Sequence, residues 1–325
     1  MFQKRTQSLM FASLVAWLTM TGVVAADFPD RPVRIVVPYA PGGGGDILAR
    51  LFADKLKARL GQPVLVENKP GAGTLIGSEF VARAKPDGYT LLLTTNSVLI
   101  APILNAAAAK YDPLADLDAV MPLADIAIVM VASPGLPAND AGQLIAYLKK
   151  NPDKVSVGSA GTGGITHLSG ELFKVSAGVS MTHVPYKGAA PALTDLAGGQ
   201  IGLLFDAMIT AGPLIKSGKI RALGMANAKC WAGAPEIPTI AESGLPGFKV
   251  SGWYGVLAPA GTPESLLLRL NIEANEVMRD PEFNAKLLAT GLTPLGGDVA
   301  NFRRMMRADF ATWAKVIKDG KITLQ

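Results

Sequence analysis

The sequence predicts an α/β fold with two lobes, each built on a central sheet flanked by helices. Short apolar runs rich in β-branched residues alternate with amphipathic helical segments, and glycine-rich turns often connect the two. Such alternation is typical of parallel sheets covered by helices on both faces. After a leader is removed, 299 residues remain, and single hydrophobic cores stop growing near this size. Two lobes are therefore expected.

The first residues, 1–26, have the order of a cleaved secretory signal peptide. Two basic residues precede an apolar stretch at 9–18, and the segment ends in the small residues Ala25 and Ala26. This order is typical of export signals. We expect cleavage after Ala26, with cleavage after Ala25 as the near alternative. A membrane anchor is disfavoured because polar residues interrupt the apolar run.

Apolar patterning gives the elements of the first part of the mature chain. The β-branched run VRIVV at 33–37 indicates a buried strand. A helix is expected from Asp46 to about Leu60, and Asp46 suits its N-cap or its first turn. The next expected elements are a strand at 64–66, a helix at 74–84 and a strand at 89–94.

The second part begins near residue 126 and shows the same alternation. We expect strands at 126–131, 155–158, 181–184, 201–205 and 221–225, and helices at 141–150, 166–175 and 191–197. Tail helices are expected at 263–278, 281–289 and 299–317. No low-complexity linker separates the two parts, so we expect short crossings between them that act as a hinge.

Charge and cysteine content limit the classes of function. Removing the leader lowers the formal charge from +5 to +3, and no basic cluster is present, which argues against nucleic acid as a partner. This mild excess is compatible with an anionic small ligand. Cys230 is the single cysteine of the chain and cannot form an internal disulfide.

Glycine-rich turns at 42–45, 159–164 and 187–189 follow predicted strands and precede predicted helices. Ligands in such folds bind beyond the carboxyl ends of the strands, where these turns lie. Glycine lets the backbone approach a ligand, and the next helix directs unpaired N–H groups towards it. Each turn alone can equally be only a tight turn, but the set together favours a carboxylate site. Further hydroxyl and amide contacts could come from Thr95, Asn96, Ser159 and Thr162.

No enzyme motif is complete. The PGGGGD segment lacks the Gly-Lys-Ser/Thr ending of a P-loop. The turns at 42–45 and 159–164 each lack the third glycine of the dinucleotide-binding fingerprint. His167 and Glu171 have a spacing that can hold a metal, but a surface pair or a capping group is the more common meaning. Asp206 follows a predicted buried strand and could hold a ligand hydroxyl, an amine or water, or cap a helix.

Sequence blocks spread over nearly the whole mature chain carry a family resemblance. They include RPVRIVVPYAPGGGGDILAR, GQPVLVENKPGAG, GSAGTGGITHLSGELF, HVPYKGAAPALTDLAGGQI and WYGVLAPAGTP. With these blocks in this order, the sequence resembles the periplasmic solute-binding proteins of tripartite tricarboxylate transporters, called Bug proteins. The resemblance implies a periplasmic binding protein-like fold with a ligand cleft between the lobes. It also implies that 27–125 and 252–325 form lobe 1 and that 126–251 form lobe 2.

The resemblance further implies how the ligand is held. The loops at 39–46 and 159–164 would bind a carboxylate with ordered water, and the second end of the ligand would meet the turn at 187–189 and the region of Asp206. The expected ligand-binding residues are Tyr39, Gly42, Gly43, Gly44, Asp46, Thr95, Asn96, Ser159, Gly161, Thr162, Gly163, His167, Lys187, Gly188, Ala189 and Asp206.

The expected function is capture of a small carboxylate by a periplasmic monomer that passes it to membrane transporter subunits, with no cofactor and no metal. The ligand would be a di- or tricarboxylate or an aromatic acid. Gly164 stands where the family often has serine, which suggests a gain in space and a bulkier ligand such as a phthalate-type dicarboxylate. The alternatives are an exported sensor of the same fold, or a carboxylate-acting α/β hydrolase that uses His167, Asp206 or Cys230.

Overall fold

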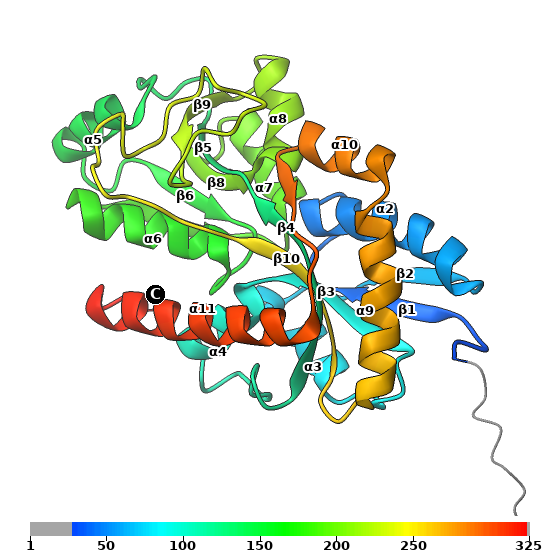
Figure 1. Cartoon of the computed structure of the whole chain (residues 1–325). Coiled ribbons are helices and arrows are strands. Elements are labelled where there is room, and N and C mark those ends of the chain that lie inside the picture. The colour runs from blue at the N-terminus through cyan, green and yellow to red at the C-terminus, as the bar shows by residue number, and fades with distance from the viewer. Residues whose placement is uncertain (1–27, 324–325) are drawn as a thin grey trace, which may run out of the picture.

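The computed structural model describes residues 28–323, so the predicted leader at 1–26 lies outside the described residues (Figure 1). The first lobe contains β1 (Val33–Val37), α2 (Gly44–Leu60), β2 (Val64–Asn68), η1 (Ala72–Thr74), α3 (Leu75–Ala82), β3 (Thr90–Thr95), α4 (Ser97–Leu104), β4 (Leu117–Ile126), β10 (Trp253–Pro259), α9 (Glu264–Met278), α10 (Pro281–Ala289), β11 (Leu292–Pro294) and α11 (Val299–Asp319). The second lobe contains β5 (Ile128–Ala132), α5 (Ala141–Lys150), β6 (Ser156–Ser159), α6 (Ile165–Ala177), β7 (Thr182–Pro185), α7 (Ala189–Ala197), β8 (Leu203–Ala207), α8 (Met208–Lys216) and β9 (Arg221–Met225).

Each lobe has one sheet with helices packed against it. The six-stranded sheet of the first lobe has the order β11-β4-β10-β3-β1-β2, and the five-stranded sheet of the second lobe has the order β7-β6-β8-β5-β9. Fully buried strands, β3 in the first lobe and β8 in the second, lie at the sheet centres, with the helices on the faces of the sheets. The predicted α/β class with two sheet-based lobes is therefore confirmed.

Both sheets are mixed, which corrects the prediction of parallel sheets. Strands β1, β2 and β3 are parallel, but β10 runs antiparallel to β3 and β4. In the second lobe, β5 runs antiparallel to β8 and β9. The reason is topological: a strand that enters from the other lobe starts at the edge of the sheet where the parallel strands end, so it runs in the opposite direction.

The chain passes between the lobes at two neighbouring points, Ala127 and Gly252. The Ile126 N–H donates to the Gly252 carbonyl at 2.9 Å. The Asn227 side chain donates to the Ile126 carbonyl at 2.9 Å and accepts from the Ile128 N–H at 2.7 Å. The side-chain amide of Asn227 thus holds both ends of the β4–β5 crossing. A hinge motion at these crossings stays a prediction.

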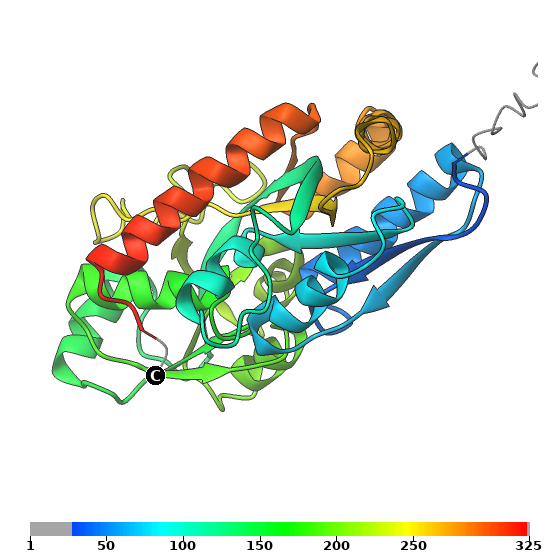
Figure 2. The ribbon, with the colours of Figure 1, turned by 90° about the horizontal axis from the view of Figure 1, so that it is seen from below.

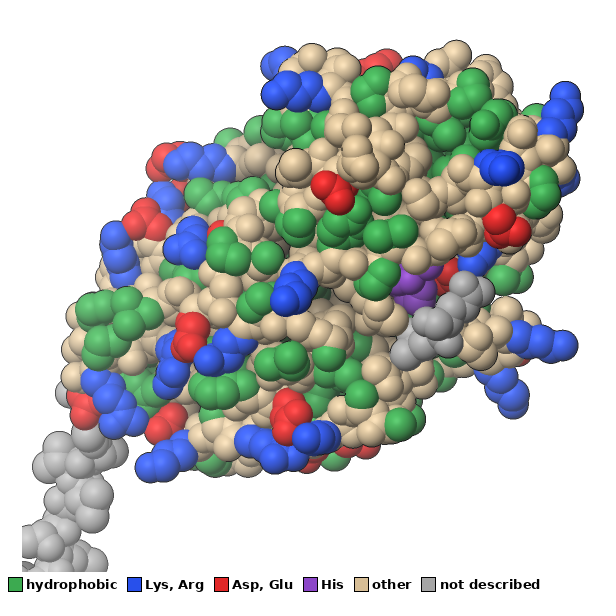
Figure 3. All heavy atoms as spheres, turned by 180° about the vertical axis from the view of Figure 1, so that it is seen from behind, with side chains coloured by type: hydrophobic (Ala, Val, Ile, Leu, Met, Phe, Trp, Pro, Cys, Tyr) green, Lys and Arg blue, Asp and Glu red, His purple; other side chains and the backbone are tan. Residues whose placement is uncertain are grey.

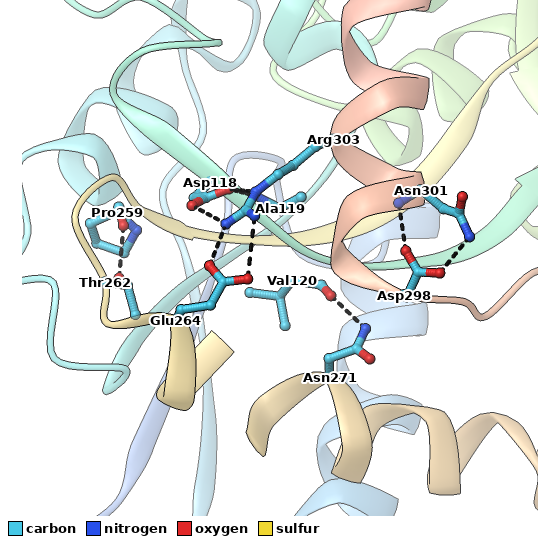
Figure 4. A network of polar contacts seen from close by, with 10 residues as sticks. All are labelled: Asp118, Ala119, Val120, Pro259, Thr262, Glu264, Asn271, Asp298, Asn301 and Arg303. Atoms are coloured by element: carbon cyan, nitrogen blue, oxygen red, sulfur yellow. Dashed lines mark hydrogen bonds and ion pairs between the residues drawn. The ribbon is translucent and has the colours of Figure 1, made fainter. Parts of the chain in front are cut away.

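The C-terminal helices return to the first lobe and are fixed there by ion pairs. Arg303 of α11 makes two contacts of 2.7 Å with the Asp118 carboxylate on β4 and one of 2.9 Å with Glu264 of α9 (Figure 4). Paired contacts of this kind fix the orientation of a guanidinium better than a single contact. From this anchor, α11 extends towards α6 of the second lobe (Figures 1 and 2), and Trp313 and Leu172 line one groove there.

One face of the molecule is mixed in charge. On the face shown in Figure 3, lysine and arginine side chains are interspersed with aspartate and glutamate side chains. Among the helices of residues 28–323, none has the length and apolar character needed to cross a membrane.

Candidate functional site

A cavity with a free volume of about 50 Å³ lies between the lobes, at the ends of the strands where the glycine turns begin. Seven of the expected binding residues line it: Tyr39, Gly43, Gly44, Thr95, Gly161, Ala189 and Asp206. Gly164, which belongs to the predicted turn at 159–164, and Tyr254 line the same wall. Residues that the site prediction missed are Gly45, Gly73, Thr74, Ser97, Ile126, Ile128, Ala160, Ile165, Thr166 and Ala207.

Several helices begin at this cavity. Gly43 is the N-cap of α2 and Gly164 is the N-cap of α6, and neither glycine has a side chain that could cap its helix. Ala189 opens α7, and Ala207 is the N-cap of α8. The first N–H groups of a helix lack intrahelical partners and carry a partial positive charge. An anion in this cavity therefore meets hydrogen-bond donors from both lobes.

The cavity wall contains no cationic side chain among the described residues that line it. Its titratable side chains are the phenols of Tyr39 and Tyr254 and the carboxyl of Asp206. Burial raises the pKa of Tyr254 well above its ordinary value, so this phenol stays neutral. Any anion is therefore held by backbone dipoles and hydroxyl groups rather than by an ion pair.

A chain of hydrogen bonds runs along the wall from one lobe to the other. The Tyr39 hydroxyl lies 2.8 Å from Thr95 Oγ1, which donates to Ser97 Oγ at 2.8 Å. The N–H of Ile165, at the start of α6, also donates to Ser97 Oγ at 2.9 Å. Because Ser97 Oγ accepts from both lobes, its own hydrogen remains for a ligand.

The lobes are closed over the cavity, and their loops touch. The Ala40 N–H donates to the Lys187 carbonyl at 3.1 Å across the cleft. A Cβ atom on Gly73 would lie 1.6 Å from the Thr162 carbonyl oxygen, and one on Gly188 would lie 3.1 Å from Ala40. This approach of two backbones is possible only without side chains at these positions.

Asp46 and Asn96 lie behind the wall and not in it. Of its two predicted positions, Asp46 takes the one in the first turn of α2, because the N-cap is Gly43. The Asp46 carboxylate accepts from the Gly42 N–H at 2.9 Å and from Arg50 at 3.1 Å. Burial raises the pKa of Asp46, but the hydrogen bonds from Arg50 and Gly42 outweigh it and lower the pKa overall. Asn96 donates to the Ser251 carbonyl at 3.1 Å, next to a lobe crossing. Both residues position loops around the cavity.

The loop at 159–164 is supported from behind by two histidines. His167 Nδ1 accepts from the Gly163 N–H at 3.1 Å, so His167 is a capping group, the meaning favoured from the sequence. Its ring stacks on His183 with centroids 3.9 Å apart, and His183 Nε2 shares a hydrogen bond of 2.7 Å with Ser159 Oγ. Ser159, Gly163 and His167 thus shape the loop without lining the cavity.

The remaining expected residues lie at the edge of the cavity. Thr162 and Lys187 line a neighbouring opening, and the Lys187 side chain is exposed. Gly42 and Gly188 have φ angles of +80° and +149° and form the turns. Cys230 is exposed and donates to Glu242 at 3.4 Å, away from the cavity. Within residues 28–323, no cluster of three or more His, Cys, Asp or Glu side chains could hold a metal.

The room expected at Gly164 is not present in the closed structure. A Cβ on Gly164 would lie 3.2 Å from Ser97 Oγ. The missing side chain therefore lets α6 approach Ser97 and does not enlarge the cavity. Gly164 therefore gives no reason to expect a bulkier ligand.

The histidine pair predicts a loss of stability at acidic pH. Burial lowers the pKa of His167 and of His183 to about 4. The unfolded chain binds protons near pH 6.5 and the folded chain does not, so this contribution to stability is present above about pH 6.5 and is lost as the pH falls towards about 4. We expect a loss of roughly 3 kcal/mol for each histidine, and up to about 6 kcal/mol for the pair.

Urea unfolding of the wild type and of the His167→Asn, His183→Gln variant at about pH 7 and pH 4.5 measures this loss. The variant should lose less unfolding free energy between these conditions than the wild type. Equal losses in both proteins would contradict the assignment. Asp206 is present in both proteins, so its own titration cancels in the comparison.

These features define a class: a two-lobed solute-binding protein with a closed cavity between its lobes that is lined by helix N-termini and hydroxyl groups. Residues 48–322 match the family described as the tripartite tricarboxylate transporter family receptor, and the chain belongs to this family. Its members are periplasmic solute-binding proteins and not enzymes. The resemblance noted in the sequence is therefore confirmed.

Known relatives cover almost the whole chain. Protein BugT of Bordetella pertussis is 35% identical over 307 residues, which cover 94% of each protein. The structure of the periplasmic binding protein BugD is similar, with a TM-score of 0.87, 35% identity, and coverage of 92% of this chain and 100% of that one. A protein of R. palustris solved with adipate has a TM-score of 0.88, 36% identity, and coverage of 91% and 99%. MatC of Rhodopseudomonas palustris, solved with malate, has a TM-score of 0.85, 31% identity, and coverage of 89% and 100%.

Proposed function

We propose that this protein captures a small carboxylate in the periplasm as a monomer and delivers it to the membrane subunits of a tripartite tricarboxylate-type transporter. The observation that carries the proposal is the convergence of helix N-termini from both lobes on one closed cavity that has no cationic side chain among its described lining residues. The N-terminal segment with the order of an export signal supports the location.

The proposed carboxylate site lies between the first turns of α2 and α6. The N–H groups of Gly44 and Gly45 supply donors from the first lobe, and the Thr166 N–H supplies one from the second, because the N–H groups of Gly164 and Ile165 are already bonded to the Gly161 carbonyl and Ser97 Oγ. Thr95 and Ser97 add hydroxyl groups. The expected residues behind the wall, such as Asp46 and His167, hold these loops in place.

The proposed ligand is a di- or tricarboxylate, with an aromatic acid as the second choice. The adipate and malate bound to the R. palustris relatives support a short aliphatic acid. A sensor role would use the same cavity and has no feature of its own in the described structure.

A thermal-shift screen of residues 27–325 tests the proposal. The panel runs from succinate, malate, adipate and citrate to amino acids, nicotinate, benzoate and phthalate. A ligand at about 100 times its Kd adds about 2.7 kcal/mol of stability, which raises the melting temperature by several degrees. If no acid in the panel raises the melting temperature, the proposed carboxylate site is wrong. Loss of uptake of the same acid in a strain without the protein tests delivery to the transporter.

A further inference from the structure

Asp206 is a buried acid that faces the ligand cavity. It is the fourth residue of β8, its side chain is 3% exposed, and it lies in the same wall as Tyr39 and Tyr254. Thr210 Oγ1 donates to Asp206 Oδ2 at 2.6 Å. An ionised carboxyl at this depth is costly unless a cation or enough donors accompany it.

No protein cation accompanies Asp206 in the described structure. The neighbouring strands β5 and β6 carry no titratable side chain, and α8 contributes Thr210. On α6, Glu171 pairs with Lys174 at 3.0 Å, and His167 is bonded to Gly163.

On α7, Asp195 accepts from Tyr186 at 2.7 Å. The groups that face Asp206 are therefore the phenols of Tyr39 and Tyr254. Burial raises the pKa of Asp206 to about 7 against the lowering effect of Thr210 and of the Ala207 backbone.

A ligand held by its carboxylate at the α2 and α6 termini would place its other end in the same small cavity, against Asp206. Two ionised carboxyl groups cannot share this space without a proton or a cation between them. An apolar end would leave the acid buried without a second partner. Either a hydrogen or a positive charge must therefore lie between Asp206 and the ligand.

We propose that Asp206 selects the second end of the ligand through one shared hydrogen. The ligand is then a carboxylic acid whose far end is a second carboxyl, an ammonium or a hydroxyl group, and acids with an apolar tail are rejected. This inference rests on the proposed function of the cavity. It adds a consequence that a carboxylate site alone does not have, which is that binding is linked to protons through Asp206.

The direction of the proton linkage distinguishes the far groups. A second carboxylate binds best when Asp206 is protonated, so its affinity falls by up to about 10-fold per pH unit above pH 7. An ammonium binds best when Asp206 is ionised, so its affinity falls as the pH drops below about 7. A hydroxyl group, which can donate or accept, gives a shallow profile.

The test uses the acid with the largest thermal shift and analogues that differ only at the far end. For a four-carbon acid these are succinate, 4-aminobutyrate, 4-hydroxybutyrate and butyrate. Calorimetric titration from about pH 6 to pH 8.5 gives each affinity. We expect butyrate to bind about 10-fold or more weakly than the best analogue, since it leaves Asp206 without a partner.

Asp206→Asn supplies the decisive comparison, because the amide has the same shape and does not titrate. The pH dependence should vanish, an ammonium ligand should lose about 100-fold in affinity, and a dicarboxylate should bind as well as before or better. Asp309→Asn is the matched control: burial also raises the pKa of Asp309, but it lies in the outer groove near Trp313. This control should keep the wild-type profile.

A second measurement needs no variant. Calorimetry of the wild type near pH 7 in two buffers of different ionisation enthalpy should show proton uptake with a dicarboxylate and proton release with an ammonium acid. Carboxylate binding without any proton linkage, or with a linkage that Asp206→Asn retains, would overturn the inference and leave the proposed function intact. A protein that binds no carboxylate would instead overturn the proposed function.

Discussion

Gly73→Ala is expected to abolish ligand capture while both lobes stay folded. Gly73 lies in η1 of the first lobe, and an added Cβ would lie 1.6 Å from the Thr162 carbonyl oxygen of the second lobe. The new methyl group clashes with the backbone of the other lobe, and this clash exists only when the lobes are closed. A methyl group here therefore removes the closed state, and affinity should fall by at least about 100-fold because the binding-competent population falls by that factor.

Gly61→Ala separates this effect from backbone strain. Gly61 ends α2 with a φ of +66°, almost the same as the +65° of Gly73, and a Cβ on Gly61 meets no atom within 4 Å. Both variants should lose about 1 kcal/mol of unfolding free energy from the left-handed conformation. Only Gly73→Ala should lose affinity in calorimetric titration. Wild-type affinity in Gly73→Ala would show that these loops do not close on the ligand.

Sequence patterns predicted several residues that line the cavity because the main parts of its wall are local in the chain. The turn at 42–45 and the turn at 159–164 are each a glycine run between an apolar strand and an amphipathic helix, and both reach the cavity. Asp206 and Thr95 were found because polar residues at strand ends fall on the ligand side of an α/β sheet. The periodic signals that give the fold class also give this edge of the sheet.

Sequence patterns could not decide which residues of a loop face inwards. In the loop at 159–164, Gly161 and Gly164 line the cavity, whereas Ser159 turns away to His183. That choice depends on the φ angles of +147° at Gly161 and +83° at Gly163, which no residue pattern reports. Ser97 and Thr74 were missed for a related reason. Ser97 meets the N–H of Ile165 only when the second lobe packs against the first, and Thr74 reaches the cavity through the turn of η1.

The sequence analysis did not predict α4, α8 and β4, and each of these elements contains a proline. Pro102 lies inside α4 and Pro213 inside α8, where proline ordinarily argues against a helix. Strand β4 contains Pro122 and pairs with β10 through register shifts, so its sequence does not alternate regularly. Strand β10, which is far from β4 in the chain, pairs with it and places Gly255 opposite Pro122, and a local pattern cannot show such a partner.

Gly43→Asp is expected to stabilise the fold slightly and to prevent binding. Gly43 is the N-cap of α2, its φ of −79° and ψ of 166° suit any residue, and no side chain caps the helix. Its Cβ would lie 3.5 Å from the Ala40 carbonyl oxygen, an ordinary contact. Aspartate is a better N-cap than glycine by a few tenths of a kcal/mol, roughly 0.3, and its charge favours the helix N-terminus.

The same carboxylate would occupy the N–H groups proposed for the ligand and repel its charge, so affinity should fall by at least about 100-fold. Gly43→Asn caps the helix without charge and should lose less, and Gly43→Ala adds neither cap nor charge and should bind within about 3-fold of the wild type. Urea unfolding and calorimetric titration measure the two effects separately. A variant that gains stability and loses binding cannot be explained by misfolding. Wild-type affinity in Gly43→Asp would place the ligand carboxylate away from α2, because a protein carboxylate and a ligand carboxylate cannot both take the same helix N-terminus.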